Sequence, residues 1–524
     1  MANTMIDEKT KIGKDVIESL TLAMYDDPKF IYREYIQNSA DQIDIAYENG
    51  LITSKDECRI EIQIDKIERR ISISDNGTGV SSEKVLPVLK NIAQGVKDRT
   101  KHKGFRGIGR LGGLAYCDKL IFETSYIGES SKSILTWNAK ELKHIINDRT
   151  KKEDASTVID EITSLHTESE NSEKRYFKVI LENVSNDILL NKDEIEDYLS
   201  MVAPVPYKKG FLFQNTIYEK AKEYNQTIDE YNLYLNNNQI FKEYTTSIYE
   251  GEKHNKKRID EVFDLEFFEI KNKKEQVLCW GWYSISKLKQ QMPDINIAKG
   301  IRLRKGNIQV GDENRLSDFF VASNVQDKRF SFYFFGEVHT LSPELIPNAR
   351  RDYFLENSAF NEFEKYIRLE FKKLKEYCYL SSNIRSEERK IEKLSSFSEE
   401  YKSPAEKGFT KPKEQEEYEE RFKQIKEEAE RAKEKIEKIK EKVANNETKN
   451  KIVNKLTSDI KQIDDIEEIK KISNQKTKLL TDNLPRLNRN DRKLVGKVLS
   501  IIDNILPKEL SDNVKLKIIE ELNK

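Results

Sequence analysis

The chain has 524 residues, with 91 Lys and Arg against 92 Asp and Glu, so its formal net charge is −1. At about 150 residues per domain, this length predicts roughly three domains. No stretch approaches the roughly 20 consecutive apolar residues of a membrane-spanning helix, so we expect no membrane protein. The balanced charge argues against a protein that coats nucleic acid through bulk electrostatics, but it is compatible with a local basic groove.

The cysteines and the first residues bear on the cellular compartment. The four cysteines lie far apart and form no C-x-x-C pair, so neither a disulfide framework nor a zinc site is expected. Residues 1–8 show neither the basic nor the apolar region of a secretory signal. We therefore expect a cytoplasmic protein.

The first 190 residues predict a mixed α+β domain. Apolar residues at helical spacing predict helices over 12–24 and 30–47. Two runs that alternate apolar and polar residues, and three later strand-like runs, predict strands of a half-buried antiparallel sheet. These runs are 58–64, 70–74, 120–124, 133–137 and 176–181. The pattern is that of a sheet covered by helices.

Two further regions follow this domain. Residues 191–380 are predicted to form a second α/β domain. Pro204-Val205-Pro206 breaks the preceding helical pattern, and the sequence after it is strand-rich and aromatic. Residues 381–412 are interpreted as a polar linker. Residues 413–524 are predicted to be helical, because apolar residues step by 3 and 4 as in a heptad seam. The seam comprises Phe422, Ile425, Ala429, Ala432, Ile436, Ile439 and Val443. A coiled coil, a helical hairpin and a single solvated helix all remain open.

The first motif lies in the helix predicted over 30–47. Glu34, Asn38 and Asp41 are spaced i, i+4 and i+7, so they share one stripe of that helix. Such a stripe is ordinarily the solvated side of an amphipathic helix. A carboxylate that polarises water and a carboxamide that ligates a hard cation such as Mg²⁺ would also need this arrangement.

Two glycine-rich motifs follow. Residues 74–80, Ser-Asp-Asn-Gly-Thr-Gly-Val, come directly after a predicted strand. They fit either a hairpin turn or a carboxylate, Asp75, that faces the edge of a flat ligand. Residues 104–113 form a glycine string at the start of an apparent helix, where free backbone N–H groups bind anions. Residues 97–110 add six basic side chains against one acid, as expected of a loop that covers phosphates.

Taken together, E-x-x-x-N-S-x-D, D-N-G-x-G and G-x-x-G-x-G resemble the GHKL ATPase superfamily. The superfamily includes gyrase, histidine kinases, MutL and the ninety-kilodalton heat-shock chaperones. The stretch 114–120, Leu-Ala-Tyr-Cys-Asp-Lys-Leu, resembles the chaperone branch and the MORC-type ATPases. The resemblance implies a GHKL (Bergerat) ATPase sandwich, a transducer or middle domain over 191–380, and ATP and Mg²⁺ as cofactors.

The resemblance also implies roles by position. Glu34 would be the general base, and Asn38 would hold Mg²⁺. Asp75 would bond the adenine amino group, with residues 80–103 as the lid over the nucleotide. The other implied nucleotide contacts are Asp41, Gly77, Gly79, Gly104, Arg106, Gly107, Ile108 and Gly109.

A fourth motif lies in the second domain, at residues 342–354. It resembles the chaperone middle-domain loop whose arginine reaches the γ-phosphate, which implies that role for Arg351; Arg350 is the adjacent alternative. The stretch 176–181 lacks the Gly-Thr pair of the chaperones, and the coiled-coil tail is not typical of them.

Two functions follow from the resemblance. The first is a nucleotide-gated clamp, expected to be a homodimer, that acts like a chaperone on protein clients. The alternative is a MORC- or MutL-like clamp on double-stranded DNA, in genome maintenance or in defence against foreign DNA. The basic runs 253–258 and 299–305 motivate the DNA alternative, although such runs are more often solvated faces.

Overall fold

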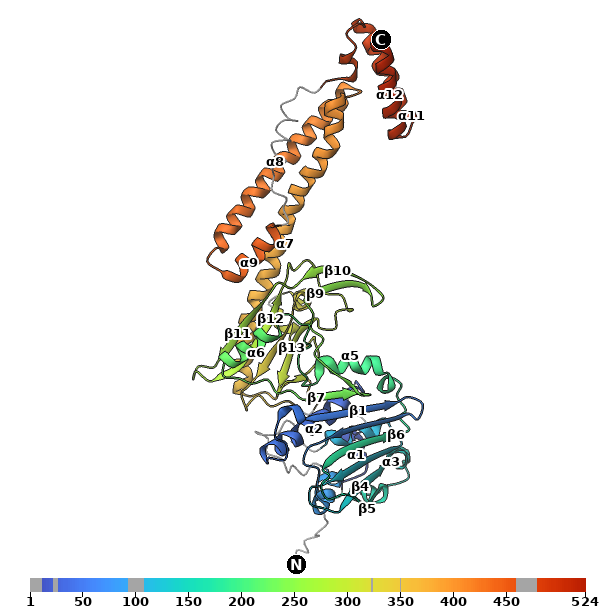
Figure 1. Cartoon of the computed structure of the whole chain (residues 1–524), viewed down its shortest axis with the longest axis vertical. Coiled ribbons are helices and arrows are strands. Elements are labelled where there is room, and N and C mark those ends of the chain that lie inside the picture. The colour runs from blue at the N-terminus through green and yellow to red at the C-terminus, as the bar shows by residue number, and fades with distance from the viewer. Residues whose placement is uncertain (1–11, 22–26, 93–107, 322–323, 349, 459–477) are drawn as a thin grey trace, which may run out of the picture. The chain divides into compact units, whose positions relative to one another are not determined.

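The computed structural model describes residues 12–21, 27–92, 108–321, 324–348, 350–458 and 478–524. The chain divides into two compact units (Figure 1). Unit 1 comprises 1–286 and 290–373, and unit 2 comprises 287–289 and 374–524. Among the described helices, none is both long enough and apolar enough to cross a membrane.

The N-terminal part of unit 1 is built on an eight-stranded sheet in the order β5-β4-β3-β6-β2-β1-β7-β8 (Figure 1). Every neighbouring pair is antiparallel except β1 and β7, which run parallel. The strands are β1 (Arg59–Asp65), β2 (Arg70–Asp75), β3 (Lys119–Ser125), β4 (Ser131–Asn138), β5 (Thr163–Ser169), β6 (Tyr176–Glu182), β7 (Asn232–Leu235) and β8 (Asn238–Gln239). All five strands predicted from the sequence are present, as β1, β2, β3, β4 and β6.

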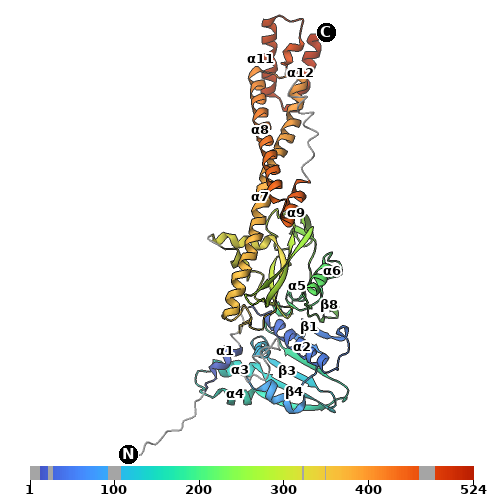
Figure 2. The same ribbon diagram turned by 90° about the vertical axis from the view of Figure 1, so that its left-hand side faces the viewer.

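Helices pack against this sheet. They are α1 (Asp15–Thr21), α2 (Phe30–Glu48), α3 (Ala139–Asn147) and α4 (Ala155–Ile162), and α1, α3 and α4 lie beside one another (Figure 2). The apolar face of α2, including Ile36 and Ile43, is buried with Ile60 and Ile71 from alternate positions of β1 and β2. Burial of one such side chain contributes about 1.5–3 kcal/mol, so this face fixes how α2 lies on the sheet.

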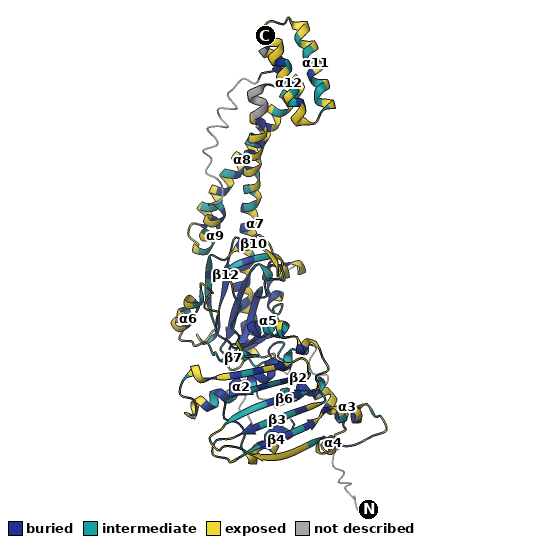
Figure 3. Cartoon of the chain, turned by 45° about the vertical axis from the view of Figure 1, so that its right-hand side comes forward, coloured by how far each residue is buried: buried dark blue, intermediate teal, exposed yellow. Residues whose placement is uncertain are grey.

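The rest of unit 1 is a second sheet, of five strands, in the order β11-β12-β15-β13-β14. Its strands are β11 (Asp264–Lys271), β12 (Val277–Ile285), β13 (Gly300–Lys305), β14 (Ile308–Val310) and β15 (Phe335–Thr340). Strands β12, β13 and β15 are almost entirely buried (Figure 3). Beside them lie α5 (Lys192–Val202), α6 (Gln214–Glu223) and the hairpin of β9 (Ser247–Glu252) and β10 (Asn255–Glu261).

Short helical turns connect these elements. They are η1 (Lys55–Glu57), η2 (Ser82–Lys84), η3 (Leu86–Lys90), η4 (Gly109–Ala115), η5 (Ile188–Leu190), η6 (Ser317–Phe320) and η7 (Val325–Tyr333). Residues 109–113 of the third motif lie in η4, a 3₁₀ helix, at the place where the sequence predicts a helix.

A buried ionic network joins α5 to the second sheet. The Glu337 carboxylate on β15 accepts hydrogen bonds from Tyr207 (2.6 Å) and Lys242 (3.0 Å), and its other oxygen lies 2.6 Å from Nε of Arg304. Burial opposes the charge of Glu337, but Arg304 and Lys242 hold its pKa well below the ordinary value. Arg304 also donates to the carbonyl of Met201 in α5 (2.7 Å), so the network fixes the end of that helix against the sheet.

Unit 2 is helical. Helix α7 (Ser358–Lys407) begins in unit 1 and continues into unit 2, which also contains α8 (Pro412–Val443), α9 (Glu447–Thr457), η8 (Leu480–Asn483), α11 (Arg489–Ile505) and α12 (Lys508–Asn523). Residues of the heptad seam are buried against α7, for example Phe422 with Phe397, and Ala432 with Ile391. The seam is therefore satisfied within one chain, as an antiparallel helical hairpin.

Two predicted boundaries differ from the structure. Residues 381–407 of the predicted linker belong to α7, because Leu394, Phe397 and Tyr401 pack on α8 and stabilise an otherwise polar helix. The first sheet also does not end at residue 190, since β7 and β8 from the second region extend it.

Candidate active site

Helix α2 positions the polar stripe of the first motif. Glu34 and Asp41 are buried, with 7% and 3% of their surface exposed, and Asn38 is half-buried. The helix is fastened to the turn η4 by Tyr35, whose hydroxyl donates to the carbonyl of Arg110 (3.0 Å) and accepts from the N–H of Gly113 (3.1 Å). The first and third motifs are therefore in direct contact.

Gly109 lies directly against the Glu34 carboxylate. A Cβ at this position would stand 2.2 Å from Oε2 of Glu34, so any other residue here would displace the Glu34 carboxylate. The glycine thus gives the backbone of the third motif its close approach to the carboxylate. Of the predicted contacts in this motif, Ile108 and Gly109 are described, whereas Gly104, Arg106, Gly107 and lid residues 93–103 lie outside the described residues.

The second motif forms a buried loop at the end of β2, and the hairpin-turn alternative is not what the chain adopts. Asp75 is 4% exposed, and its Oδ1 accepts the N–H of Gly77 (2.9 Å). Cβ atoms at Gly77 and Gly79 would stand 2.7 Å from Gln42 and 2.0 Å from the carbonyl of Ser125. Gly79 also has φ +67°, a conformation that glycine adopts without strain. Both glycines are therefore required by this loop.

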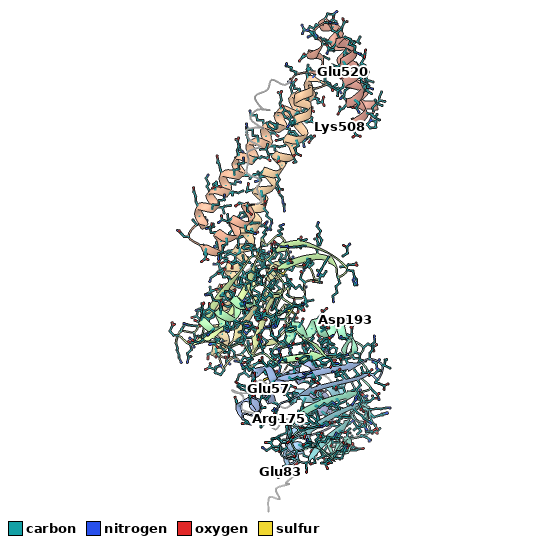
Figure 4. All side chains as sticks on the ribbon, viewed as in Figure 1. Glu57, Glu83, Arg175, Asp193, Lys508 and Glu520 are labelled. Atoms are coloured by element: carbon teal, nitrogen blue, oxygen red, sulfur yellow. The ribbon has the colours of Figure 1, made fainter. Side chains whose placement is uncertain are left out.

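Two residues that the sequence analysis did not single out hold the second motif in place. Arg175, labelled in Figure 4, donates to the carbonyls of Asn76, Gly77 (2.8 Å) and Leu51 (2.8 Å). Gln42 accepts the hydroxyl of Thr78 (2.6 Å). Gln42 directly follows Asp41, the last residue of the first motif, so its position on α2 could have indicated that it lies near the site. Arg175 has no such signal in the sequence, because it is 98 to 124 residues from its partners along the chain.

Arg351 of the fourth motif reaches the first motif. Its Nε lies 2.9 Å from Oε1 of Glu34, and the two side chains are 15% and 8% exposed. Arg351 has φ +54°, which costs a non-glycine residue of order 1–3 kcal/mol. Its carbonyl accepts the N–H of Gly311 (2.8 Å), and its N–H donates to Asn348 (3.2 Å). Arg350 contributes its carbonyl to Nη2 of Arg33 (3.2 Å).

The donor set fits a nucleotide with a metal ion held largely by phosphates. Asp75 is a buried carboxylate, and Glu34 and Arg351 form an ion pair beside Gly109. Among the described residues, no group of three or more His, Cys, Asp or Glu could hold a metal ion. Mg²⁺ typically takes one or two protein oxygens and completes its shell with phosphate and water, so Asn38 alone is compatible with it.

Most described side chains of the two basic runs in the second domain are buried or form ion pairs within the chain. Arg302 and Arg304 are buried, with 4% and 0% of their surface exposed, and Lys299 pairs with Asp294. In the other run, Lys253 pairs with Asp197 (2.8 Å) and Arg258 with Glu261 (2.5 Å). These residues do not form a continuous free basic surface.

Comparison with known proteins matches residues 32–170 to the family model described as histidine kinase-, DNA gyrase B-, and HSP90-like ATPase. The chain is similar to the chaperone protein HtpG of Escherichia coli (strain K12), with 29% identity over 164 residues, 28% of this chain and 26% of that protein. HtpG of Burkholderia ambifaria is 28% identical over 143 residues, 24% of this chain and 23% of that protein. The similarity thus spans about a quarter of the length of these relatives.

The matched segment contains α2, the loop after β2 and the turn η4, which are the three motifs that the structure brings together. Residues 32–170 are therefore similar to the ATPase domains of the GHKL superfamily, and in this segment the chain resembles the HtpG chaperones.

Proposed function

We propose that this protein binds ATP with Mg²⁺, hydrolyses it to ADP and phosphate, and works as a nucleotide-gated dimeric clamp on protein clients. The observation that carries the proposal is the contact between Glu34 and Arg351. These residues are 317 positions apart and come from different domains of unit 1, and they meet beside the glycine of the phosphate motif. A base and a cation brought together by domain packing are what phosphoryl transfer to water requires.

Each residue has a defined task in this proposal. The Glu34 carboxylate accepts a proton from the attacking water, and burial keeps competing water away from it. Arg351 places its guanidinium where negative charge develops in the transition state. Asp75 accepts a hydrogen bond from the adenine amino group. Its own position is fixed by the N–H of Gly77.

The metal would be held by Asn38 together with nucleotide phosphates, and it would neutralise charge on the transferred phosphoryl group. Asn38 lies one helical turn from Glu34 on the same stripe of α2. The catalytic base and the metal ligand thus share one rigid support, which keeps their separation constant when other parts of the protein move.

Action on protein clients is supported by the relatives, which are chaperones by name, whereas dimerisation follows from the resemblance to the superfamily. The DNA-clamp alternative is less well supported, since Arg302 and Arg304, two cations of the runs that motivated it, are buried in the fold. Turnover stimulated by duplex DNA, with a steep dependence on salt, would favour that alternative.

The decisive experiment is steady-state ATP turnover by the wild type beside Glu34→Ala. We expect the variant to lose about 100-fold or more in kcat, as for removal of a general base, while ATP affinity stays largely intact. Loss of ATP binding in the variant would instead mean that Glu34 has a structural role.

A further inference from the structure

An open groove of about 990 Å³ lies in unit 2 between the start of α8 and α11. Its walls are joined by two backbone hydrogen bonds: the N–H of Phe409 donates to Lys478, and the N–H of Leu480 donates to Phe409, both at 2.9 Å. Gly408 allows the chain to turn here, with φ +100° and the backbone of Leu480 2.9 Å from where its Cβ would be. The walls of the groove are therefore held in place by the backbone of the helical unit.

The lining of the groove is strongly cationic. Lys411, Arg489, Lys493 and Lys497 line it, and Asp482 is the one acid among its lining residues. Within the described part of the chain, none of these four cations has a carboxylate at ion-pair distance. Many exposed lysines elsewhere do pair, for example Lys253 with Asp197. The groove thus carries positive charge that the fold does not neutralise.

An apolar row runs along the same helix. Leu494, Val498, Ile501 and Ile505 are 44–72% exposed, and they are spaced by 4, 3 and 4 residues. This spacing forms the seam by which one helix packs on another. Ile501 belongs to both features, since it also lines the groove. Cations and aliphatic side chains therefore form one continuous surface.

We propose that this surface binds an acidic amphipathic helix of a partner protein. Carboxylates of such a helix would pair with Lys493 and Lys497, and its apolar residues would cover the row that contains Ile501. A nucleic acid fits less well, because aliphatic side chains stand beside the cations and residues 478–524 contain no aromatic residue to stack on bases. The same lack of Trp, Tyr and Phe makes a membrane surface a poorer match.

The test uses the full-length chain and a fluorescein-labelled helical peptide of about 20 residues, with Leu at heptad positions a and d and Glu elsewhere. We expect saturable binding in fluorescence anisotropy, and a Kd at least tenfold weaker for Lys493→Glu/Lys497→Glu and for Ile501→Ser. The matched control is Lys508→Glu/Lys517→Glu, which makes the same charge change at exposed positions of α12 outside the groove; Lys508 is labelled in Figure 4. A peptide with Lys in place of Glu should not bind.

Three results would overturn the proposal. The first is equal loss of peptide binding in the control, and the second is no peptide binding by a folded wild type. The third is groove-dependent binding of a 30-base-pair duplex, of phosphatidylserine vesicles or of a second copy of the chain in place of the peptide. The inference is independent of the proposed ATPase activity, so ATP turnover of each variant reports separately on unit 1.

Discussion

The Glu34 carboxylate is held from three sides. Tyr35 fastens its helix to η4, Gly109 contacts its Oε2, and Arg351 lies 2.9 Å from its Oε1. A carboxylate fixed in this way loses little further freedom when a reaction begins, which is the condition for efficient proton transfer. The site is therefore preorganised by residues from both domains of unit 1.

Asp75 tests the adenine assignment. We expect Asp75→Asn to raise the Kd for ATP at least 100-fold, because an amide offers one acceptor and one donor where the ligand and Gly77 need acceptors. Isothermal titration calorimetry would measure this loss. Asp56→Asn, at an exposed position before β1, is the matched control and should bind as the wild type does. Micromolar affinity retained by Asp75→Asn would remove this role.

Arg351 tests the contribution of the second domain. We expect Arg351→Ala to slow ATP hydrolysis by about tenfold or more, which corresponds to at least about 1.4 kcal/mol of transition-state stabilisation. Affinity for ATP should change much less, since the guanidinium acts on charge that develops during the reaction. Single-turnover hydrolysis would measure the rate. Arg350→Ala is the control. If Arg350→Ala slowed hydrolysis and Arg351→Ala did not, the role in transition-state stabilisation would belong to Arg350.

For single residues, the sequence allows prediction of the contiguous motifs, but it does not allow prediction of contacts between residues that are far apart along the chain. Glu34 and Asp75 stand in short strings whose residue types define their chemistry. Arg175 contacts the loop at 76–77 only because β6 lies beside β2 in the sheet, a pairing that no local pattern of the sequence encodes. The position of Arg351 followed from resemblance alone, and its contact with Glu34 depends on domain packing.

Among the secondary structure elements, predictability follows burial. Strands with one buried face alternate and were predicted, as for β1 and β2. Strand β5 was missed because almost all of its residues are exposed, which leaves no alternation to read. The polar stretch in α7 has the composition of a linker, and it is helical because one face packs on α8.

Glu230, which follows α6, carries the clearest pH dependence. Burial raises its pKa to about 7, although Tyr218 donates to both of its oxygens at 2.8 and 3.0 Å. The raised pKa means that its stabilising contribution is complete below about pH 4.5 and is lost as the pH rises to about 7. We expect Glu230→Gln to be more stable than the wild type at pH 8, by roughly 1–3 kcal/mol, and to differ little at pH 5.

Urea denaturation followed by tryptophan fluorescence at both pH values would measure this difference, since Trp280 and Trp282 report on the second sheet. Glu219→Gln, on an exposed position of α6, is the control and should show no such dependence. A stability difference equal at pH 5 and pH 8 would contradict the ionisation of Glu230 as its cause.

For the whole molecule, the division into two compact units predicts that the stability of one unit is largely independent of the stability of the other. The described residues of the proposed nucleotide site all belong to unit 1, whereas the α7–α8 hairpin from Leu374 onward belongs to unit 2. Each unit has its own apolar clusters. Local damage to the core of unit 2 should therefore leave the nucleotide site intact.

Ala429 provides the test of this separation. Its side chain is fully buried in the seam of α8, so Ala429→Glu places a carboxylate among Phe397, Phe422 and Ile425. A buried charge without a partner destabilises by several kcal/mol, and we expect helical circular dichroism to melt at a markedly lower temperature. The Kd for ATP should stay within twofold of the wild type. Lys423→Glu, which adds the same group on the exposed side of α8, should change neither quantity. If Ala429→Glu also abolished ATP binding, the two units would have to unfold as one, because no residue of the described nucleotide site touches the substituted position.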